Sequence, residues 1–453
     1  MGADETQPGQ PPSAHERAAI VSVGDELSLG QTVNTNSRWV AERLTGVGII
    51  TVEHVTVADD EAALVGALSR LAGVVDLLIV TGGLGPTLDD LTRQALAAAM
   101  GDTLVEDAIA LEQVSAWFTS RGRVMPELNK VQALRPTRAT SLQNLHGTAP
   151  GLHGVIGRCD CFCLPGPPRE MQPMFSAQVA PRLRPPPGRT VATRVLHTVG
   201  IGESDLATRL GAMMKRQGDE GVLVGTTASG GIVSVRLRYE GPLAPYDADH
   251  LLEKHMREVR VRAGAYVFGT GEDTLAGVVV KLLRERGERV GAVESCTGGL
   301  LSGMLTDVAG SSQVFAGGLI TYSNALKQSL AGVDASLFGP EGPGAVSREC
   351  ALAMATGGLE KLGVEHCLAI TGIAGPGGAV PAFGTRPGKP VGTVYIARAS
   401  RQAGAGRVST DVRHFTMAGD RASVRDWSAK SALAMLRLHL AGAEELKLLR
   451  QAD

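Results

Sequence analysis

Apolar runs that end in small-residue turns recur along this chain. Residues 18–23 and 76–80 are almost wholly apolar, and each is followed by a glycine-containing turn and then by a segment with helical spacing. Short apolar runs bounded by turns are typical of strands that are buried on both faces. The repeated order of strand, turn and helix predicts a doubly wound α/β sheet.

The same pattern divides the chain into parts. A chain of 453 residues is too long for one ordinary core. A proline-rich linker at 182–188 follows the first α/β unit, and a second unit begins after the glycines near 269. We predict two three-layer α/β domains joined by a small α+β connecting domain. The predicted boundaries are a disordered tail at 1–17, a first domain at 18–180, a connecting domain at 190–262 and a second domain at 264–453.

Composition excludes several classes of function. The formal net charge is −2 and aromatic residues make up 4% of the chain. No basic stripe interleaved with aromatic residues is present, so nucleic acid is not expected as a main partner. The apolar runs are short and interrupted, which argues against a membrane span. The first residues are polar and lack an apolar signal core, so we expect a cytoplasmic protein.

Three of the six cysteines alternate along the sequence as Cys159, Cys161 and Cys163. A period of two places all three on one face of a strand, where free cysteine packs as a small hydrophobic residue. A zinc site usually has Cys-x-x-Cys spacing and further ligands. We therefore predict packing rather than metal binding, and no disulfide framework.

The stretch Glu-Ser-Cys-Thr-Gly-Gly at 294–299 carries the most chemistry in the chain. A serine hydroxyl becomes a nucleophile when a base takes its proton, and a lysine whose pKa is lowered by burial, here Lys327, can be that base. Cys296 is an equally natural nucleophile, since a cysteine thiol needs less activation than the hydroxyl of Ser295. The residues alone leave this choice open.

Backbone groups around this stretch are candidates for binding the substrate. Free N–H groups at a helix start can stabilise an oxyanion, and glycines let the backbone approach a ligand closely. A second glycine-rich turn follows the apolar run at 367–370, and two such turns can face one crevice at the carboxyl edge of a sheet. The candidate binding residues are Cys296, Thr297, Gly298, Gly299, Gly372 and Gly375, with Thr371 beside them.

The first unit contains another candidate site, in which a glycine turn at 81–87 precedes Asp89 and Asp90. Backbone N–H groups of such a turn suit a phosphate, and a carboxylate beside it suits a hard cation. The candidate phosphate-binding residues are Gly82, Gly83, Gly85, Thr87 and Asn36, and the candidate metal ligands are Asp90, Asp25 and Glu26. Asp90 is the favoured ligand. Two alternatives stay open, in which Asp89 only caps a helix and Asp59-Asp60 only forms a turn.

Both halves of the chain resemble one known family. In the first half the stretches that carry the resemblance are Gly24–Leu27, Thr81–Thr87, Gly147–Gly151 and Leu164–Gly166. In the second half they are Glu294–Gly299, Thr321–Asn324, Thr371–Pro376, Lys389–Thr393 and Gly419–Arg421. The first set is similar to the molybdopterin-binding domain of the competence/damage-inducible CinA family, and the second to its nicotinamide-nucleotide amidohydrolase domain. The resemblance covers almost all of the chain beyond Arg17.

The resemblance implies two activities. The second domain is expected to deamidate nicotinamide mononucleotide (NMN) to nicotinic acid mononucleotide and ammonia, without a cofactor. The first domain is expected to cleave ADP-ribose with a divalent cation, Mg, Mn or Co. The alternative is a nucleotide- or pterin-binding protein without N-terminal catalysis. A homodimer is also expected.

The resemblance also implies roles for single residues of the deamidase. It assigns the nucleophile to Ser295 and the base to Lys327, with support from Tyr322 and Thr371. We expect Tyr322 to orient Lys327 or to pass a proton. Arg421 is the favoured phosphate ligand because a guanidinium binds phosphate in a bidentate manner, with Arg413 and Arg425 as alternatives. A Pro- and Gly-rich insertion at 379–388 is expected to reshape the loop near the nucleotide.

Overall fold

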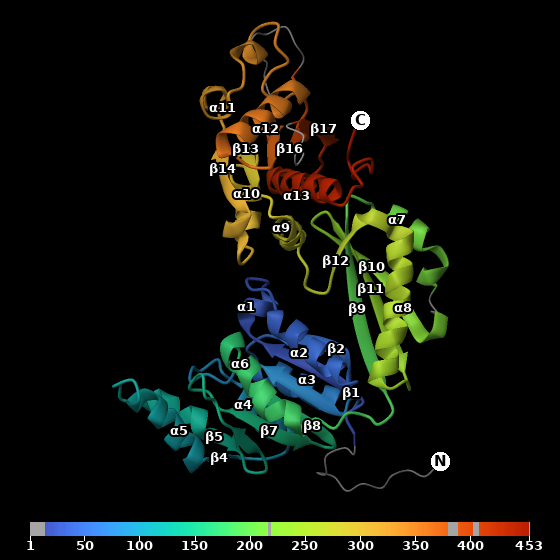
Figure 1. Ribbon diagram of the computed structural model, residues 1–453. Coiled ribbons are helices and arrows are strands. Elements are labelled where there is room, and N and C mark those ends of the chain that lie inside the picture. Colours follow the sequence, from blue (N-terminus) through green and yellow to red (C-terminus); the bar gives the residue numbers. More distant parts are fainter. Residues whose placement is uncertain (1–13, 216–218, 379–387, 402–406, 453) are drawn as a thin grey trace. The chain divides into compact units, whose positions relative to one another are not determined.

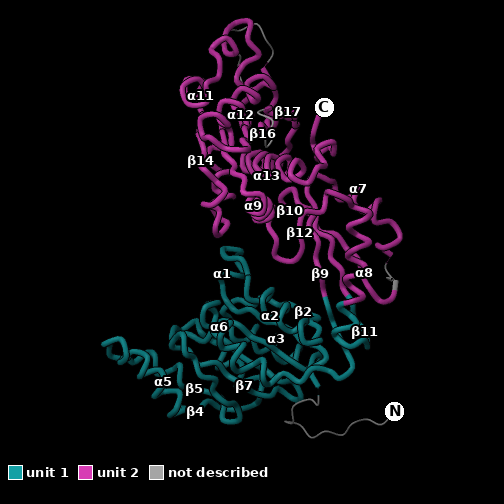
Figure 2. The backbone as a smooth tube through the Cα atoms, viewed as in Figure 1, with its two compact units in different colours: residues 1–192, 239–249 teal, residues 193–238, 250–453 magenta. Residues whose placement is uncertain are grey.

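A computed structural model of the chain describes residues 14–215, 219–378, 388–401 and 407–452. The chain forms two compact units (Figure 2). Unit 1 contains residues 1–192 and 239–249, and unit 2 contains residues 193–238 and 250–453.

Unit 1 is built on a six-stranded sheet with the order β2-β1-β3-β8-β7-β6. Strands β2, β1, β3 and β8 are parallel, whereas β7 is antiparallel to both β8 and β6. The strands are β1 (Arg17–Val23), β2 (Ile50–Val57), β3 (Leu77–Thr81), β6 (Thr140–Leu142), β7 (Gly151–Ile156) and β8 (Cys159–Leu164). The two apolar runs that predict strands are therefore the neighbouring central strands β1 and β3.

Helices cover both faces of this sheet, because alternate residues of its buried strands point to opposite sides. Val21 and Leu78 pack in the cluster beneath α3 and α4, and Ile20 and Ile79 pack in the cluster beneath α2 and α6. The helices are α1 (Asp25–Ser28), α2 (Thr35–Gly46), α3 (Glu61–Ala72), α4 (Thr92–Ala99), α5 (Ala108–Thr119) and α6 (Pro168–Met174). A short antiparallel pair, β4 (Leu104–Glu106) and β5 (Leu134–Pro136), lies outside the main sheet. The predicted α/β class is confirmed.

The cysteine-rich strand β8 behaves as its period predicts. Cys159, Cys161 and Cys163 all join the core cluster shared with α3 and α4. All six cysteines of the chain are buried free thiols. The interpretation of these residues as packing residues is confirmed.

The amino-terminal segment joins the fold earlier than the predicted boundary at residue 17. Strand β1 already includes Arg17, and the buried His15 places Nε2 2.9 Å from Asp160 Oδ2. His15 N also donates to Arg184 O over 2.7 Å. The same Asp160 carboxylate contacts His153, with 3.0 Å between His153 Nε2 and Asp160 Oδ1. This buried polar network fixes residues that composition alone assigns to a tail.

A smaller sheet follows, with the strand order β10-β11-β9-β12. Its elements are β9 (Thr190–Val199), α7 (Glu203–Leu210), β10 (Val222–Ser229), β11 (Ile232–Gly241), α8 (Pro245–Ala263) and β12 (Val267–Thr270). This region has the predicted α+β character.

The sheet of the second α/β domain has the order β14-β13-β15-β16-β17. Strands β14, β13 and β15 are parallel, and β16 and β17 continue the sheet in antiparallel fashion. The strands are β13 (Val290–Glu294), β14 (Phe315–Ile320), β15 (His366–Gly372), β16 (Thr393–Arg401) and β17 (Val408–Thr416). Because β13, β14 and β15 are parallel, their carboxyl ends lie at one edge of the sheet.

Two groups of helices complete the three layers of this domain. One core cluster joins α9, α10 and α13 to the sheet, and a second joins α11 and α12 to the opposite face (Figure 1). The helices are α9 (Leu275–Arg286), α10 (Leu300–Thr306), α11 (Asn324–Ala331), α12 (Arg348–Leu362) and α13 (Arg421–Leu440).

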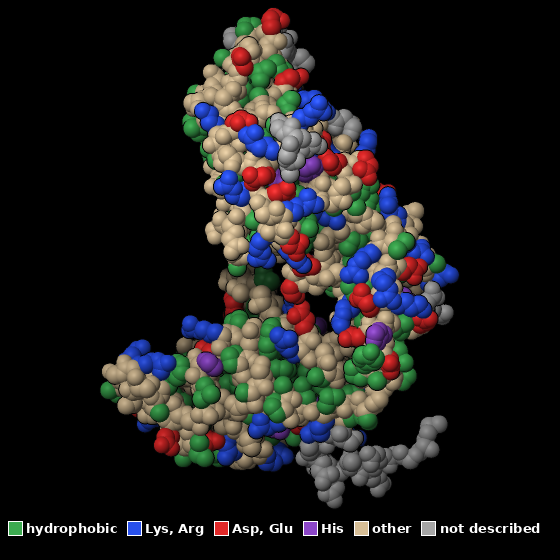
Figure 3. Space-filling model, in the orientation of Figure 1, with side chains coloured by type: hydrophobic (Ala, Val, Ile, Leu, Met, Phe, Trp, Pro, Cys, Tyr) green, Lys and Arg blue, Asp and Glu red, His purple; other side chains and the backbone are tan. Residues whose placement is uncertain are grey.

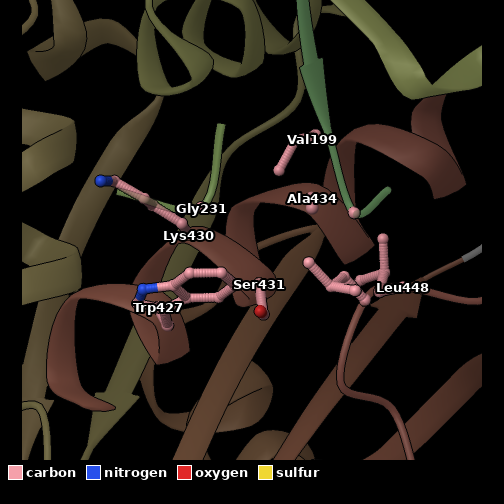
Figure 4. A pocket seen from close by; sticks show the side chains of 9 residues that line it. Val199, Gly231, Trp427, Lys430, Ser431, Ala434 and Leu448 are labelled. Carbon is pink, nitrogen blue, oxygen red and sulfur yellow. The ribbon is translucent and has the colours of Figure 1, made fainter. Parts of the chain in front are cut away.

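Helix α13 also contacts the smaller sheet of unit 2. Lys430 Nζ donates to Gly230 O over 2.8 Å, in the turn between β10 and β11. A pocket beside this contact is lined by side chains such as Val199, Trp427, Lys430 and Leu448 (Figure 4). The Lys430 amine is held by Gly230 O and by Asp426, so the pocket is part of the packing between α13 and the smaller sheet.

The surface agrees with a chain of low net charge. On the face in Figure 3, basic and acidic side chains of unit 2 are interspersed rather than segregated. Among the helices that the structure describes, none combines the length and apolar character that a membrane crossing requires.

Candidate active site

The tight turn after β13 presents Ser295 at the carboxyl edge of the second sheet. Ser295 N donates to Ile370 O of β15 over 3.0 Å, and Gly298 N closes the turn on Ser295 O over 3.1 Å. Gly298 and Gly299 have φ angles of 58° and 98°, which residues with a side chain rarely adopt. The two glycines therefore permit the turn that leads from β13 into α10.

Lys327 reaches Ser295 from α11. Its side chain is 2% exposed, and Nζ lies 3.0 Å from Ser295 Oγ and 2.8 Å from Thr321 O. Ser323 caps the start of α11 by accepting a hydrogen bond from Leu326 N over 3.2 Å. The helix start and the Thr321 carbonyl together aim the amine at the hydroxyl.

Burial favours the neutral form of this amine. Desolvation lowers the pKa of Lys327, since a charged ammonium is disfavoured away from water. Cys350 and Cys296 would oppose this effect as thiolates. Burial raises the pKa of each thiol to about 11, so both are neutral near pH 7 and desolvation decides the direction.

The same observation separates the two candidate nucleophiles. Cys296 is buried among the apolar residues of the core cluster with α9 and α13, and its pKa is raised to about 11 chiefly by desolvation. A thiol in this state carries almost no thiolate at neutral pH. Ser295, by contrast, has a buried amine within hydrogen-bond distance. The geometry favours Ser295.

Other predicted residues gather around this pair. Arg421 donates from Nη1 to Gly375 O over 2.7 Å and from Nη2 to the Tyr322 hydroxyl over 3.1 Å. Tyr322 is 61% exposed, and among the described residues no hydrogen bond joins it to Lys327. The Thr321 carbonyl takes the orienting role that we expected of Tyr322. Thr371 donates its hydroxyl to Ala345 O over 2.7 Å, so it supports the wall of the site.

The three candidate phosphate ligands differ clearly in their surroundings. Arg413 is buried, and its guanidinium already binds Asp411 and the carbonyl oxygens of Leu446 and Glu444. Arg421 and Arg425 both lie in the first turns of α13. Arg425 Nη2 donates to Thr297 O over 2.7 Å. Arg413 is therefore set aside, while Arg425 contacts the serine turn and Arg421 contacts Gly375 and Tyr322.

The insertion expected to reshape the nucleotide loop lies almost wholly outside the described residues, since 379–387 are not described. On either side of it, Gly378 and Lys389 belong to the described chain. Lys389 Nζ donates to Val346 O, and the neighbouring Ala345 O accepts the hydrogen bond from Thr371.

In unit 1 the glycine turn after β3 is organised by Asp90. Its carboxylate accepts hydrogen bonds from Gly85 N over 2.7 Å and from Thr87 N over 2.8 Å. Gly82 and Gly83 have positive φ angles, and a Cβ on Gly82 would lie 2.3 Å from Val23 O. Asp90 Oδ2 also accepts a hydrogen bond from the Thr87 hydroxyl. The carboxylate is therefore bound by its own loop, and only Oδ1 keeps a second lone pair for another partner.

Acidic residues gather beside this turn. Asp25 N donates to Asp59 Oδ2 over 3.0 Å, and Asp59 N donates to Asp25 Oδ1 over 3.1 Å. Burial raises the pKa of Asp59, and the negative charges of Asp25, Asp89 and Glu26 raise it further. Within the described ranges, however, no three acidic, histidine or cysteine side chains are arranged to hold a metal ion.

Two open alternatives for the acidic pairs can now be separated. Asp60 caps α3 by accepting a hydrogen bond from Ala63 N over 2.7 Å, whereas Leu91 rather than Asp89 occupies the cap position of α4.

Asn36 donates from Nδ2 to Gly166 O over 2.7 Å, and its buried Oδ1 has no partner in the described chain. Asn36 therefore joins two of the turns at the carboxyl edge of the first sheet.

Comparison with known proteins places all three regions in one family. Residues 272–440 match the "CinA C-terminal domain", residues 19–185 the "Probable molybdopterin binding domain" and residues 193–269 the "Damage-inducible protein CinA KH domain". A CinA-like protein of Geobacter sulfurreducens is 38% identical over 426 residues, which is 94% of this chain and 99% of that protein. The chain belongs to the CinA family.

A second relative agrees with this assignment. A CinA-like protein of Synechococcus sp. (strain CC9902) is 40% identical over 426 residues, covering 93% of this chain and 97% of that protein. The crystal structure of a CinA protein from Thermoplasma acidophilum is 32% identical and covers 38% of this chain and 99% of that one, with a TM-score of 0.35.

Two residues of this CinA site escaped the sequence interpretation. Thr321 acts through its carbonyl oxygen, which no side-chain motif can indicate. Glu294 lies within the motif and had no predicted role, although a glutamate that ends a wholly apolar strand is an unusual residue to bury. That contrast was the signal available in the sequence.

Proposed function

We propose that the second α/β domain hydrolyses the carboxamide of NMN to nicotinic acid mononucleotide and ammonia. The observation that carries this proposal is the 3.0 Å contact between the buried Lys327 amine and the Ser295 hydroxyl. A neutral amine at hydrogen-bond distance from a serine is the arrangement that an amide-cleaving nucleophile requires.

The first half of the reaction forms an ester. Ser295 Oγ attacks the carboxamide carbon while its proton passes to Lys327 Nζ, whose other contact to Thr321 O keeps the lone pair directed at Ser295. The negative oxygen of the tetrahedral intermediate accepts hydrogen bonds from the backbone N–H groups of Cys296 and Thr297. Lys327 returns the proton to the nitrogen, the C–N bond breaks and ammonia leaves.

The second half releases the acid. Water attacks the ester carbon and gives its proton to Lys327, and the proton then returns to Ser295 Oγ as the C–O bond breaks. Arg421 is the proposed partner of the 5′-phosphate, since its guanidinium contacts Gly375 and Tyr322, which follow the carboxyl ends of β15 and β14. None of these steps requires a cofactor.

For unit 1 we propose a metal-dependent cleavage of ADP-ribose. The supporting observation is the glycine turn after β3, where Gly82 and Gly83 have positive φ angles, beside the carboxylates of Asp25, Glu26 and Asp59. Carboxylates are the right donors for Mg, Mn or Co, and Mg²⁺ is usually held by one or two carboxylates together with substrate phosphates. Such a divalent cation would neutralise charge on the pyrophosphate when bound. A nucleotide- or pterin-binding role without catalysis is the competing proposal for this unit.

We further propose that the protein works in the cytoplasm as a homodimer. The six free thiols suit a reducing compartment. Light scattering of the purified full chain measures the oligomeric state directly.

One pair of assays tests these proposals. Purified full-length protein is given NMN without added metal, and ammonia release is measured. The same protein is then given ADP-ribose with and without a divalent cation, and AMP is measured. Absence of ammonia release would contradict the deamidase, and absence of AMP at every metal would favour the binding role of unit 1.

A further inference from the structure

Glu294 is a buried carboxylate directly before the serine nucleophile. It ends β13 and is 0% exposed. Its oxygens accept hydrogen bonds from Gly299 N over 3.0 Å, Leu301 N over 3.1 Å and Ser302 N over 2.8 Å. Ser302 Oγ donates a fourth over 2.7 Å. All four partners are donors, so both carboxylate oxygens act as acceptors.

These contacts decide which backbone amides remain free near Ser295. The N–H groups of residues 295, 298 and 300 donate to backbone carbonyls, and those of 299, 301 and 302 donate to Glu294. Within the described chain, the N–H groups of Cys296 and Thr297 have no carbonyl or carboxylate acceptor. Both belong to the turn that Ser295 opens. Two free neighbouring amides beside a nucleophile are the donors that an oxyanion needs.

The main chain of Glu294 supports the base as well. Glu294 O accepts a hydrogen bond from Thr321 N over 2.8 Å, and Thr321 O in turn accepts one from Lys327 Nζ over 2.8 Å. The residue therefore connects the serine turn to the segment that aims Lys327. The backbone part of this connection survives any change of the Glu294 side chain.

We propose that the Glu294 carboxylate is a positioning residue that reserves the Cys296 and Thr297 amides for the reacting oxygen. By binding the three amides at the start of α10, it fixes the turn at 295–299 and removes competing donors. Glutamine at this position has nearly the same size, but it replaces one acceptor with an NH₂ donor that faces backbone donors. This inference rests on the proposed deamidation, because it concerns the oxyanion of that reaction.

The test uses Glu294→Gln in the full-length protein, with Glu288→Gln as the matched control. Glu288 precedes the same strand and pairs with His366 at 3.0 Å, at the end of the sheet opposite the serine turn. We expect Glu294→Gln to lower kcat for NMN about 100-fold, the loss typical of an impaired oxyanion donor. KM should change less than about threefold, because the donors act on the transition state. The pH midpoint of kcat should stay in place, and Glu288→Gln should match the wild type.

A second readout does not depend on the substrate. An alkyl fluorophosphonate labels an activated serine when Oγ displaces fluoride from phosphorus, and the phosphoryl oxygen uses the same donors. The labelling rate of Ser295, followed by intact mass, should fall with kcat in Glu294→Gln. If the wild type releases no ammonia from NMN and yet labelling falls in the variant, the substrate is wrong and the positioning role stands.

Three results would overturn the inference. They are a folded Glu294→Gln protein with unchanged kcat and labelling, a loss confined to KM, and a shifted pH midpoint with unchanged labelling at high pH. Should Glu294→Gln fail to fold, Ser302→Ala removes only one donor to the carboxylate. This variant should lose about threefold to tenfold in kcat and labelling, in line with one hydrogen bond to a charged group. Unchanged values in folded Ser302→Ala would then count against the proposal.

Discussion

Each of the two glycine-turn sites of this protein lies at the carboxyl edge of a sheet. The reacting groups of the second site are already in contact, whereas those of the first site are not. In the second domain, Ser295 and Lys327 are both buried and already in contact at 3.0 Å. In the first, Asp90 is occupied by its own loop, and the neighbouring carboxylates form no three-ligand metal cluster within the described residues. A nucleophile and its base must be placed before the substrate arrives, whereas carboxylates can wait for a cation that the substrate phosphates help to hold.

The two sites also differ in the charge of their side chains and in how far burial disfavours that charge. Lys327 is buried, and desolvation disfavours its charged form, which is the property that its proposed role as a base requires. The carboxylates of Asp25 and Asp59 lie close together near the surface, where a bound cation would relieve their mutual repulsion. The proposed deamidation should therefore depend on pH, and the proposed reaction of the first site should depend on a metal ion.

The strongest test of the preassembled site removes its nucleophile. Ser295→Ala should lower kcat for NMN by about 10⁴-fold or more, because the residue acts with Lys327 as a unit. Cys296→Ala should keep kcat within about threefold, since its thiol stays protonated at neutral pH. Ammonia release by both variants measures this difference. A folded but inactive Cys296→Ala would make the thiol the nucleophile.

The base is tested by a substitution that keeps the positive charge. Lys327→Arg should lower kcat by about 10²-fold to 10⁴-fold, because guanidinium does not give up a proton at these pH values. Lys327→Met serves as the uncharged comparison and should be equally inactive. If Lys327→Arg retains wild-type ammonia release, lysine is not the base.

The pH dependence follows from the lowered pKa of Lys327. Activity requires the neutral amine, so kcat should rise with pH through the folded-state pKa, which lies below the ordinary 10.5. In the same window the unfolded chain binds more protons than the folded chain, so the melting temperature should also rise with pH. Lys327→Met should lose this share of the rise. A kcat that falls with pH from 6 to 9 would contradict the neutral-base role.

The ligand-dependent site is tested by Asp90→Asn. One oxygen of Asp90 becomes an NH₂ group that faces the amide of Gly85 or Thr87, so the loop should distort. ADP-ribose cleavage should fall about tenfold to 100-fold, as is typical when a supporting ligand contact is lost. Ammonia release from NMN should not change, because the serine site lies in the other domain. Equal losses in both assays would show that the two sites are not independent.

The smallest effect is expected at the phosphate. Arg421→Met should raise KM for NMN about tenfold, in keeping with a lost hydrogen bond to a charged group worth about 1.5–3 kcal/mol. Nicotinamide riboside, which lacks the phosphate, should be affected far less. Arg425→Met is the comparison on the same helix face. If only Arg425→Met distinguishes the two substrates, Arg425 is the phosphate ligand.

Much of the fold was predictable because its strands are apolar and its turns need glycine. The runs at 18–23 and 76–80 became the central strands β1 and β3, and Cys159, Cys161 and Cys163 packed on one face as their period of two requires. The tail boundary was wrong by a few residues, because a polar network around Asp160 buries His15. Composition cannot reveal a hydrogen-bond partner that lies 145 residues away in sequence.

For the candidate site, the sequence by itself determined which residue types are available: a serine followed by a thiol, two glycines that accept positive φ angles, and a lysine on a later helix. Only the tertiary structure decided their states. Burial raises the pKa of Cys296 and lowers the pKa of Lys327, so the neutral form of each is favoured. Tyr322 accepts a hydrogen bond from Arg421 instead of contacting Lys327. Arg413 binds carbonyl oxygens of its own domain and is therefore not a phosphate candidate. The tertiary structure also placed a carboxylate, Glu294, against three amides of the next helix. The reason is physical: protonation, hydrogen bonding and charge depend on distance and on water, and residues far apart in the chain set both of these.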